Sequence, residues 1–313
     1  MTGPFVRYLG AKAARAVLTI WLVVTFVFLA LRAAGDPARI LLGQDATDAM
    51  VADYRDKMGL NGSLLEQYAS YLAAAIRGDF ETSFLFRRDA MDVVLEHLPQ
   101  TVCLSLLALT LAIAVGGCLG IAAATNRGGR VDAAVQGVSM VGYAIPNYFL
   151  AVVLVLVFSE TLGWLPAAGA GRPGHVVLPA VALAAPNAAM IARFLRSSMI
   201  EALESRYIAA ARSRRVPEWR IVLLHALPNA AIPVLTVVGL MVGGLIGGAI
   251  IIETIFSWPG VGRLFFSSVV ARDIPVVQAI VLLAGAMMVL ANLAVDVCYG
   301  WLDPRIRLRA GPG

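Results

Sequence analysis

Long apolar runs separated by short polar segments dominate the chain. A helix that crosses a bilayer core of about 30 Å needs about 20 apolar residues, and six runs reach that length. They occupy residues 13–31, 98–124, 133–158, 176–194, 230–252 and 276–302. The runs are continuous rather than alternating, so they predict helices and not the strands of a barrel. The pattern therefore predicts an all-α membrane protein with six transmembrane helices.

The spacing of the runs divides the chain into four parts. The first part is a short tail with the first span, the second is a long loop, the third is a five-helix core, and the fourth is a second tail: residues 1–32, 33–97, 98–302 and 303–313. The long loop contains two short amphipathic stretches, around residues 49–58 and 64–76. The core contains a second long loop at about 200–229, which is rich in arginine.

The distribution of basic residues predicts the orientation of the chain in the membrane. Short cytoplasmic loops of membrane proteins are enriched in Lys and Arg. If the N-terminus lies inside, 15 of the 25 basic residues fall on the cytoplasmic side. The long loop 33–97 carries 11 acidic and six basic residues and then lies outside. We therefore expect both termini in the cytoplasm and an extracytoplasmic loop after the first helix.

Composition excludes several classes of protein. Of the 313 residues, 59% are hydrophobic and 14% are charged, whereas soluble domains contain roughly 45–50% apolar and about 25% charged residues. The mean hydropathy is +0.80, which excludes a soluble globular enzyme and a disordered chain. The net charge of +5 lies mostly on arginines that flank apolar runs, so we expect a lipid bilayer as a partner and no nucleic acid.

Motifs for chemistry are missing from the sequence. Three cysteines and three histidines are scattered without the spacing of a metal site, so we expect no metal. The sequence contains no phosphate-binding G-x-x-x-x-G-K-[ST] motif, no H-E-x-x-H and no G-x-S-x-G. It therefore predicts no enzyme and no catalytic residue, and any ATP must be handled by another chain.

The arginine-rich loop 200–229 predicts a pair of helices. Ile200, Leu203, Tyr207 and Ala211 recur at helical spacing and predict one apolar face. Pro217 breaks this helix, because the residue before a proline avoids helical angles. A second helix with Glu218 at its positive end is expected to stop near Pro228. The pair is either a solvated loop or a lever that contacts a partner, since an apolar face needs lipid or protein to cover it.

This loop resembles the EAA loop of the membrane subunits of ABC importers. That loop has the pattern E-A-A, three residues, G, nine residues, I-x-L-P. Ala210-Ala211 and Leu227-Pro228 match it in spacing, whereas Ala209, Arg215 and His225 replace its Glu, Gly and Ile. The Arg at 215 leaves open whether the tight turn of the pattern is kept.

The resemblance extends along nearly the whole chain and is closest to the B-type permeases of oligopeptide, dipeptide and nickel importers. The most specific matches are Gly35-Asp36-Pro37-Ala38, Leu98-Pro99-Gln100-Thr101, the run 253–262 with Trp258-Pro259-Gly260, and Arg272-Asp273-Ile274-Pro275. The long loop after the first span also fits the B-type subunit. The resemblance implies the type I ABC-importer permease fold in the bacterial inner membrane.

The resemblance also implies partners and a coupling site. The expected partners are a homologous C-type permease, two ABC ATPase subunits that bind ATP and magnesium, and an extracytoplasmic solute-binding protein. This chain itself is expected to bind no cofactor. The loop docks on an ATPase in such permeases, and the positions carried over to that contact are Tyr207, Ala210, Ala211, Arg212, Arg215, Pro217 and Glu218.

Polar and aromatic residues near the ends of spans are candidates for a pathway or an outer gate. These are Asn147, Glu253, Phe256, Trp258 and Pro259, together with the intramembrane carboxylate Asp296. A carboxylate at the bilayer centre costs about 2.5–3.5 kcal/mol on insertion scales, so Glu253 and Asp296 must face protein or water. Each either caps a neighbouring helix, takes part in substrate passage or relays protons.

Three functions fit these features, of which a signalling or assembly scaffold, the last, predicts no flux at all. The first is the permease subunit of an ATP-driven importer, with peptides as the expected cargo. The alternative is a stand-alone ion-coupled secondary transporter that uses Asp296 or Glu253 as its coupling group. Five glycines between residues 239 and 248 either pack within the chain, contact the second permease or line the pathway.

Overall fold

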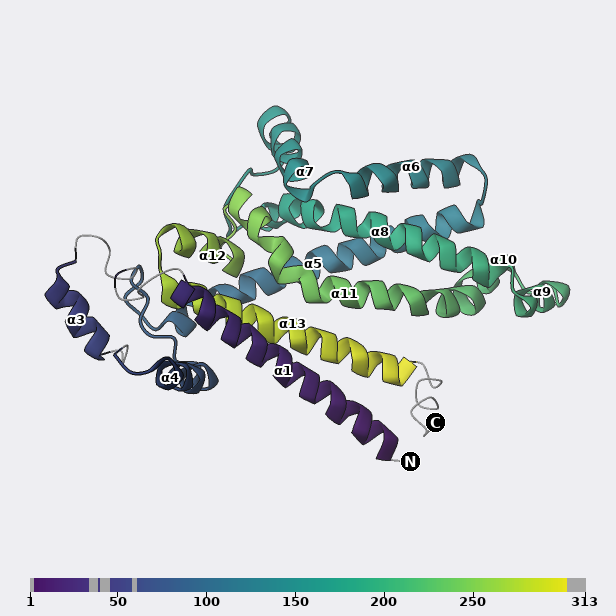
Figure 1. The fold of residues 1–313 in the computed structure, drawn as a ribbon. Coiled ribbons are helices and arrows are strands. Elements are labelled where there is room, and N and C mark those ends of the chain that lie inside the picture. The colour runs from purple at the N-terminus through teal and green to yellow at the C-terminus, as the bar shows by residue number, and fades with distance from the viewer. Residues whose placement is uncertain (1–2, 34–38, 40–45, 58–60, 303–313) are drawn as a thin grey trace.

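The computed structural model describes residues 3–33, 39, 46–57 and 61–302 and consists of helices joined by short loops (Figure 1). The α-helices are α1 (Gly3–Ala33), α3 (Asp48–Lys57), α4 (Leu64–Arg77), α5 (Ala90–Thr125), α6 (Arg130–Ala144), α7 (Asn147–Leu154), α8 (Val177–Leu203), α9 (Arg206–Ser213), α10 (Glu218–Arg220), α11 (Leu227–Ile255), α12 (Val261–Val270) and α13 (Ile274–Leu302). Two π-helical segments, Val155–Thr161 and Ile221–Ala226, and the 3₁₀ turn Pro173–Val176 complete the set. The predicted all-α class is confirmed.

Five helical segments of the described chain are long and apolar enough to cross a membrane, and a bent pair raises the number to six. They lie in α1, in α5, in α8 with the 3₁₀ turn before it, in Glu218–Val242 (α10, the second π-helical segment and part of α11) and in α13, and the bent pair is α6 with α7 and its π-helical extension. The helices are longer than the apolar runs: α5 starts at Ala90 rather than at residue 98, and α8 continues to Leu203 rather than 194. Polar first and last turns extend a helix beyond its apolar part. The apolar runs therefore predict which segments span the membrane better than they predict where each helix begins and ends.

The third predicted span, residues 133–158, is a bent pair of helices rather than one straight helix. The chain breaks between α6 and α7, and the two parts meet at 102°. Ile145, which precedes Pro146, has the extended angles φ −77° and ψ 123°, because the proline ring clashes with a helical residue before it. Figure 1 shows α7 standing across the bundle. Pro186 also lies inside a predicted span, but α8 continues through that residue.

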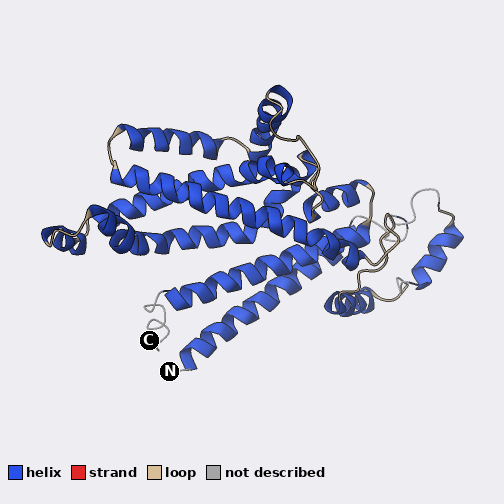
Figure 2. Ribbon diagram, turned by 180° about the vertical axis from the view of Figure 1, so that it is seen from behind, coloured by secondary structure: helices blue, strands red, loops and turns tan. Residues whose placement is uncertain are grey.

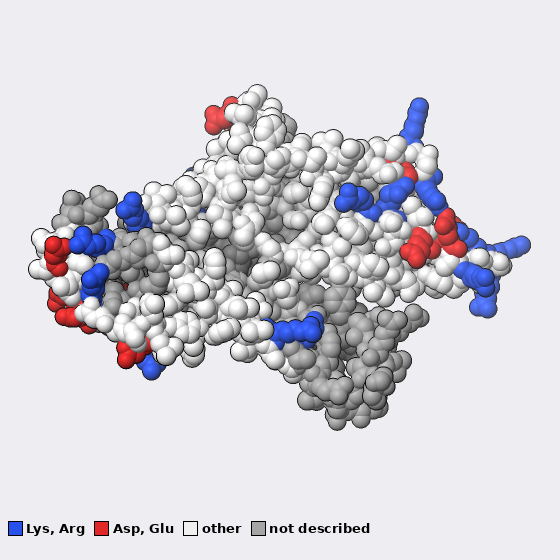
Figure 3. All heavy atoms as spheres, in the orientation of Figure 1, with Lys and Arg blue, Asp and Glu red and all other residues white. Residues whose placement is uncertain are grey.

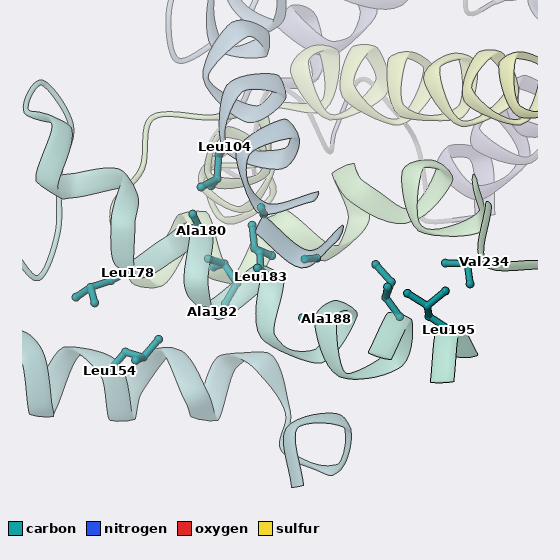
Figure 4. Close-up of a cluster of buried hydrophobic side chains, with 14 of the residues drawn as sticks. Leu104, Leu154, Leu178, Ala180, Ala182, Leu183, Ala188, Leu195 and Val234 are labelled. Atoms are coloured by element: carbon teal, nitrogen blue, oxygen red, sulfur yellow. The ribbon is translucent and has the colours of Figure 1, made fainter. Parts of the chain in front are cut away.

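Helix α8 lies at the centre of the bundle and packs against α5, α6, α7 and α11. Small residues let α5 and α8 approach closely: a Cβ atom on Gly116 would lie 2.5 Å from the carbonyl oxygen of Ala188. Figure 4 shows alanines and leucines of α8, including Ala182, Leu183 and Leu195, inside this core. Helix α6 is joined to α8 by the buried Asp132, whose oxygens accept from Arg196 Nε at 2.5 Å and Nη2 at 2.7 Å.

A second apolar cluster holds the other end of the bundle together. Helix α12 packs there between the start of α5 and the first turns of α13. Helices α1 and α13 run side by side, as the front and back views both show (Figures 1 and 2). The N-terminal end of α1, the C-terminal end of α13, and α9–α10 point towards one end of the bundle, and α3, α4 and α12 lie at the opposite end (Figure 1).

On the face shown in Figure 3, most charged side chains gather at the two ends of the molecule, with a largely uncharged band between them. The end that carries α9 and α10 is mainly basic, and the end with α3 and α4 mixes both signs (Figure 3). An uncharged band across the spans is what a bilayer core requires. The basic end is the one that the loop charges predict to be cytoplasmic.

Candidate functional site

The hairpin formed by α9, α10 and the turn between them projects from the basic end of the bundle (Figure 1). Its turn is a Schellman motif: the amide of Arg215 donates to the carbonyl of Arg212 at 2.9 Å, and the amide of Val216 donates to that of Ala211 at 3.2 Å. Arg215 has φ +56°. The tight turn of the EAA pattern is therefore kept, with Arg in the left-handed position that Gly usually takes.

The helix boundaries of the hairpin differ from the prediction. The face of Ile200, Leu203, Tyr207 and Ala211 is divided, because α8 ends at Leu203 and α9 begins after Ser205. Ile208 is the fully buried residue of α9, whereas Tyr207 is exposed. The predicted stop near Pro228 is also wrong: the chain continues from α10 through the π-helical segment into α11. Pro228 directly follows the π-helical segment, so this residue without an amide donor lies where regular α-helical hydrogen bonding is already interrupted.

One ion pair lies within the hairpin, and a second lies beside it at the end of the bundle. Within the hairpin, Arg212 binds Glu218 through Nε at 2.9 Å and Nη2 at 3.3 Å. Next to it, Arg127 of the α5–α6 loop pairs with Glu204 at the end of α8. These four side chains line one pocket of about 250 Å³, together with apolar residues of α5, α8 and the π-helical segment. The hairpin therefore has a fixed shape, and a pocket lies between the hairpin and the bundle.

One side of the hairpin is apolar and is left exposed by the part of the chain that the structure describes. Trp219 is 57% exposed, and Leu223 and Leu224 beside it are also exposed. Tyr207 is half covered, and its hydroxyl accepts a hydrogen bond from Asn229 Nδ2 at 3.0 Å. Exposed apolar surface of this kind marks a contact with another protein or with lipid.

Of the predicted coupling residues, the structure places six on the outside of the hairpin. Ala211 is half-buried against the core, and the other six are exposed: Tyr207, Ala210, Arg212, Arg215, Pro217 and Glu218. Ala210 lies opposite the buried Ile208 on α9, since two residues along a helix turn by about 200°. A partner that covers the hairpin would therefore meet Ala210 before Ala211.

At the opposite end of the bundle, the buried carboxylate of Glu253 binds the start of α12. Its Oε2 accepts from the amides of Gly262 at 2.7 Å and Arg263 at 3.1 Å. Its Oε1 accepts from the hydroxyl of Thr101 at 2.7 Å. The hydroxyl oxygen of Thr101 in turn accepts from the amide of Val261 at 2.7 Å. Glu253 thus has the geometry of the helix-capping alternative, and a part in substrate passage stays a prediction.

The aromatic residues after Glu253 also lie inside the protein. Phe256 and Trp258 are buried, and the indole Nε1 of Trp258 donates to the carbonyl oxygen of Gln100 at 3.1 Å. Pro259 is half-buried between them and α12. These contacts build a rigid corner between α11, α5 and α12. The corner is closed among the described residues, and its use as an outer gate stays a prediction.

Three further candidates lie away from this corner. Asn147 is the first residue of α7 and is half-buried at the bend. Asp296 lies in α13, but its side chain is outside the described residues. Cβ atoms added to Gly244, Gly247 and Gly248 would meet nothing within 4 Å, so these glycines do not pack against the described residues. Among the described residues, no three His, Cys, Asp or Glu side chains lie close enough to hold a metal ion.

Two buried polar contacts were not predicted from the sequence. Asp132 with Arg196 joins α6 to α8, and Asp273 binds the loop between α4 and α5 through Ser83, whose hydroxyl donates to Oδ2 at 2.5 Å. Partners 64 and 190 residues apart leave no local pattern. The only available signals were a lone Asp next to a helix start and the Arg272-Asp273 pair of the motif.

Comparison with known proteins gives matches over almost the whole chain. Residues 116–308 match the family described as binding-protein-dependent transport system inner membrane component. Residues 5–105 match the N-terminal region of the same class of membrane component. The glutathione transport system permease protein GsiC of Escherichia coli strain K12 is 39% identical over 292 residues, which cover 93% of this chain and 95% of that protein. GsiC of Salmonella typhi has the same identity and coverage.

Solved structures with a similar fold come from other ABC transporters. An inward-facing structure of the methionine transporter MetNI has a TM-score of 0.57 at 17% identity and covers 67% of this chain and 96% of its own. The crystal structure of an amino acid ABC transporter with histidines has a TM-score of 0.52 at 18% identity and covers 66% and 92%. At such low identity the likeness concerns the fold alone, and it places the helical bundle among type I importer permeases.

Proposed function

Because this chain belongs to the family of binding-protein-dependent transport system inner membrane components, we propose that it forms half of the membrane pore of an ATP-driven importer of peptides. The chain is a multi-pass permease subunit of the bacterial inner membrane. Because the family consists of components of binding-protein-dependent transport systems, it argues against the alternative of a stand-alone ion-coupled transporter. The observation that carries the proposal is the family match over the core, joined to an exposed hairpin at the basic end.

The proposed cargo is a short peptide or a peptide-like thiol such as glutathione. Support comes from the relatives named as glutathione transport permeases, which align with 93% of this chain. The permease alone does not fix the cargo, because a solute-binding protein selects it before delivery. The substrate class is therefore the part of the proposal that the binding protein tests most directly.

The proposed assembly contains four kinds of chain. Permeases of this family act in general with a second permease, ATPases and a binding protein. We place the C-type permease beside this chain, two ATPase subunits at its hairpin end, and the solute-binding protein at the opposite end. ATP and magnesium bind to the ATPases, and this chain holds no cofactor and performs no catalysis.

The hairpin is the element that transmits the movement of the ATPases. Its Schellman turn and the Arg212–Glu218 pair give it a fixed shape, and Trp219, Leu223 and Leu224 expose apolar surface to a partner. Its buried Ile208 joins the core. A push on α9 therefore reaches α8 and α11 through packed side chains, which is how a contact outside the membrane moves the spans.

Reconstitution in liposomes tests the function. The complete complex is expected to import labelled peptide or glutathione only with ATP and the binding protein present. Omission of the ATPases is expected to abolish import, because this chain has no nucleotide site. Import by the permeases alone, driven by a proton or sodium gradient, contradicts the proposal.

A substitution at the outer side of α9 tests the hairpin. Ala210→Arg is expected to lower the import rate roughly tenfold or more, which corresponds to about 1.4 kcal/mol of lost contact free energy. Ala210→Ser adds little volume at the same place and is the matched control. Both variants should reach the membrane in equal amounts, and an unchanged import rate in Ala210→Arg excludes the hairpin from the ATPase contact.

A further inference from the structure

Helix α4 presents three distinct faces. Tyr68, Tyr71 and Ala75 lie on one face at helical spacing. Leu65, Leu72 and Ile76 form a second, apolar face beside it. Polar residues occupy the remaining side: Glu66, Ser70 and Arg77. Each of these sides suits a different environment: the rest of the protein, an apolar medium, or water.

The first face packs against α1 within its membrane span. The hydroxyls of Tyr68 and Thr25 form a hydrogen bond of 2.7 Å. The ring of Phe28 lies 5.2 Å from that of Tyr68 and 5.6 Å from that of Tyr71, measured between centroids. Thr25 and Phe28 belong to the apolar span Lys12–Ala30, near the end opposite the hairpin. These contacts fix α4 at the depth where the span meets the membrane surface.

The orientation of α4 is that of a helix lying along the membrane surface. Figure 1 shows α4 almost end-on while α1 runs across the view, and Figure 2 shows the same from behind. The helix therefore lies across the direction of the spans. An amphipathic helix in this position buries its apolar side at the boundary between headgroups and acyl chains.

The second face is apolar, and the described residues leave its ends uncovered. Leu65 is 77% exposed and Ile76 is 79% exposed. The neighbouring surface of α1 is lipid-facing by the same measure, since Leu22, Phe26 and Leu29 are all more than half exposed in a membrane span. The apolar face of α4 continues this surface, so lipid rather than water is its natural surrounding.

The polar side of α4 is built to stay in water. Ser63 and Glu66 form a capping box: the Ser63 amide donates to Glu66 Oε2 at 2.7 Å, and the Glu66 amide donates to Ser63 Oγ at 3.3 Å. The bonds to Ser63 hold the pKa of Glu66 below its usual range, which keeps its charge. The helix ends at Gly78 with φ +74°, so its length is fixed at both ends.

We propose that α4 is an interfacial helix whose partner is the lipid of the membrane leaflet opposite the hairpin, with Leu65 and Ile76 inserted below the headgroups. The helix then braces α1 from the side and fixes its depth. This inference depends on the membrane location of the chain and not on the cargo or on the ATPases, so it is independent of the proposed import cycle.

Spin labels on α4 test the proposal in the complete transporter in lipid nanodiscs. The variants Leu65→Cys, Ile76→Cys and Ser70→Cys, made without the three native cysteines, place one label each on the apolar or the polar side. The label at 70 is the matched control, because its side chain is also exposed on the same helix. Collision with oxygen reports lipid, and collision with a water-soluble nickel chelate reports water.

The expected result is a ratio of oxygen to nickel collisions several-fold higher at positions 65 and 76 than at 70. Equal and high nickel accessibility at all three positions overturns the proposal, because α4 then stands in water. Protection of 65 and 76 from both reagents also overturns it, since a protein then covers the face. The last measurement is made with and without the solute-binding protein, so that this occupant is identified.

Discussion

Three residues with side chains occupy left-handed positions directly after a helix. Arg215, Ser257 and Arg272 have φ +56°, +50° and +57° and follow α9, α11 and α12. Each stands at the C′ position of a Schellman motif, where glycine is common because it lacks a Cβ. The hydrogen bonds of the motif hold the turn, so the side chain is strained but not excluded. The Gly of such a sequence pattern is therefore favoured in the turn but is not required for it.

Arg215→Gly is expected to stabilise the protein slightly while it leaves the turn unchanged. A left-handed residue with a Cβ costs about 1–2 kcal/mol, and the greater freedom of Gly in the unfolded chain offsets part of this gain. The net effect is a stabilisation of at most about 1 kcal/mol, measured by thermal unfolding of the purified complex.

Arg214→Gly is the control, because Arg214 has φ −83° and gains nothing from Gly. This neighbouring variant should be less stable than the original chain. Loss of stability in Arg215→Gly as large as that in Arg214→Gly contradicts the account of strain at residue 215.

At the scale of elements, α12 depends on side chains from two other helices. The first amides of a helix have no partner inside the helix. Glu253 of α11 and Thr101 of α5 supply acceptors for those of Val261, Gly262 and Arg263. The carboxylate also favours the positive end of the helix. One buried network therefore sets the relative position of three helices, where the sequence showed only a carboxylate in an apolar run.

Thr101→Val is expected to destabilise the protein by about 1–3 kcal/mol, because a buried donor to a carboxylate and an acceptor for a helix amide are lost together. Valine has the same shape, so little cavity forms. The loss is measured as a lower midpoint of thermal or denaturant unfolding.

Thr254→Val is the matched variant one residue after Glu253. Its hydroxyl donates only to the carbonyl of Ile250 in its own helix, at 2.8 Å, so its loss should cost less than about 1 kcal/mol. Equal effects of the two substitutions would show that the network around Glu253 does not hold α12.

The hairpin shows that the spacing of apolar residues does not predict where one helix ends and the next begins. Ile200, Leu203, Tyr207 and Ala211 have the spacing of one face, yet the chain turns after Leu203. After the turn, Ile208 rather than Tyr207 enters the core. A break of one or two residues rotates every later side chain, and the spacing of apolar residues carries no record of it.

At the scale of the whole molecule, buried polar contacts tie distant segments together. Asp273, between α12 and α13, accepts from the hydroxyl of Ser83 at 2.5 Å and from the amides of Phe84 at 3.3 Å and Leu85 at 3.2 Å. The loop between α4 and α5 is thereby fixed to the far part of the chain. This contact holds the region around α4 on the bundle, on which a fixed depth for that helix depends.

Ser83→Ala is expected to destabilise the protein by about 1–3 kcal/mol, since it leaves a buried carboxylate without one of its donors. The loop should also become more sensitive to proteolysis between α4 and α5. Thermal unfolding and limited proteolysis of the complex in detergent measure the two effects.

Ser267→Ala is the control on α12. The hydroxyl of Ser267 donates to the carbonyl of Leu264 within its own helix, so its loss affects neither the loop nor Asp273. A loop that stays protected in Ser83→Ala would show that Asp273 does not anchor it.

The sequence by itself determined the all-helical class, the spans and the family. Membrane spans follow from composition, because each apolar run must satisfy its backbone hydrogen bonds within its own helix. The amphipathic stretches that became α3 and α4 and the turn at Pro217 are equally local. The sites of breaks next to prolines were readable too, although Pro146 bends its span by 102° while Pro186 leaves α8 continuous.

Only the tertiary structure decided which groups meet. The donors to Glu253 come from α5 and α12, those to Asp273 come from the loop before α5, and the partner of Asp132 lies on α8. Such contacts depend on how helices pack side by side, and packing depends on the shapes of all neighbours together. The sequence around one position therefore predicts a charged side chain or a helix, but it does not predict which residue that side chain contacts. The fold determines the contact.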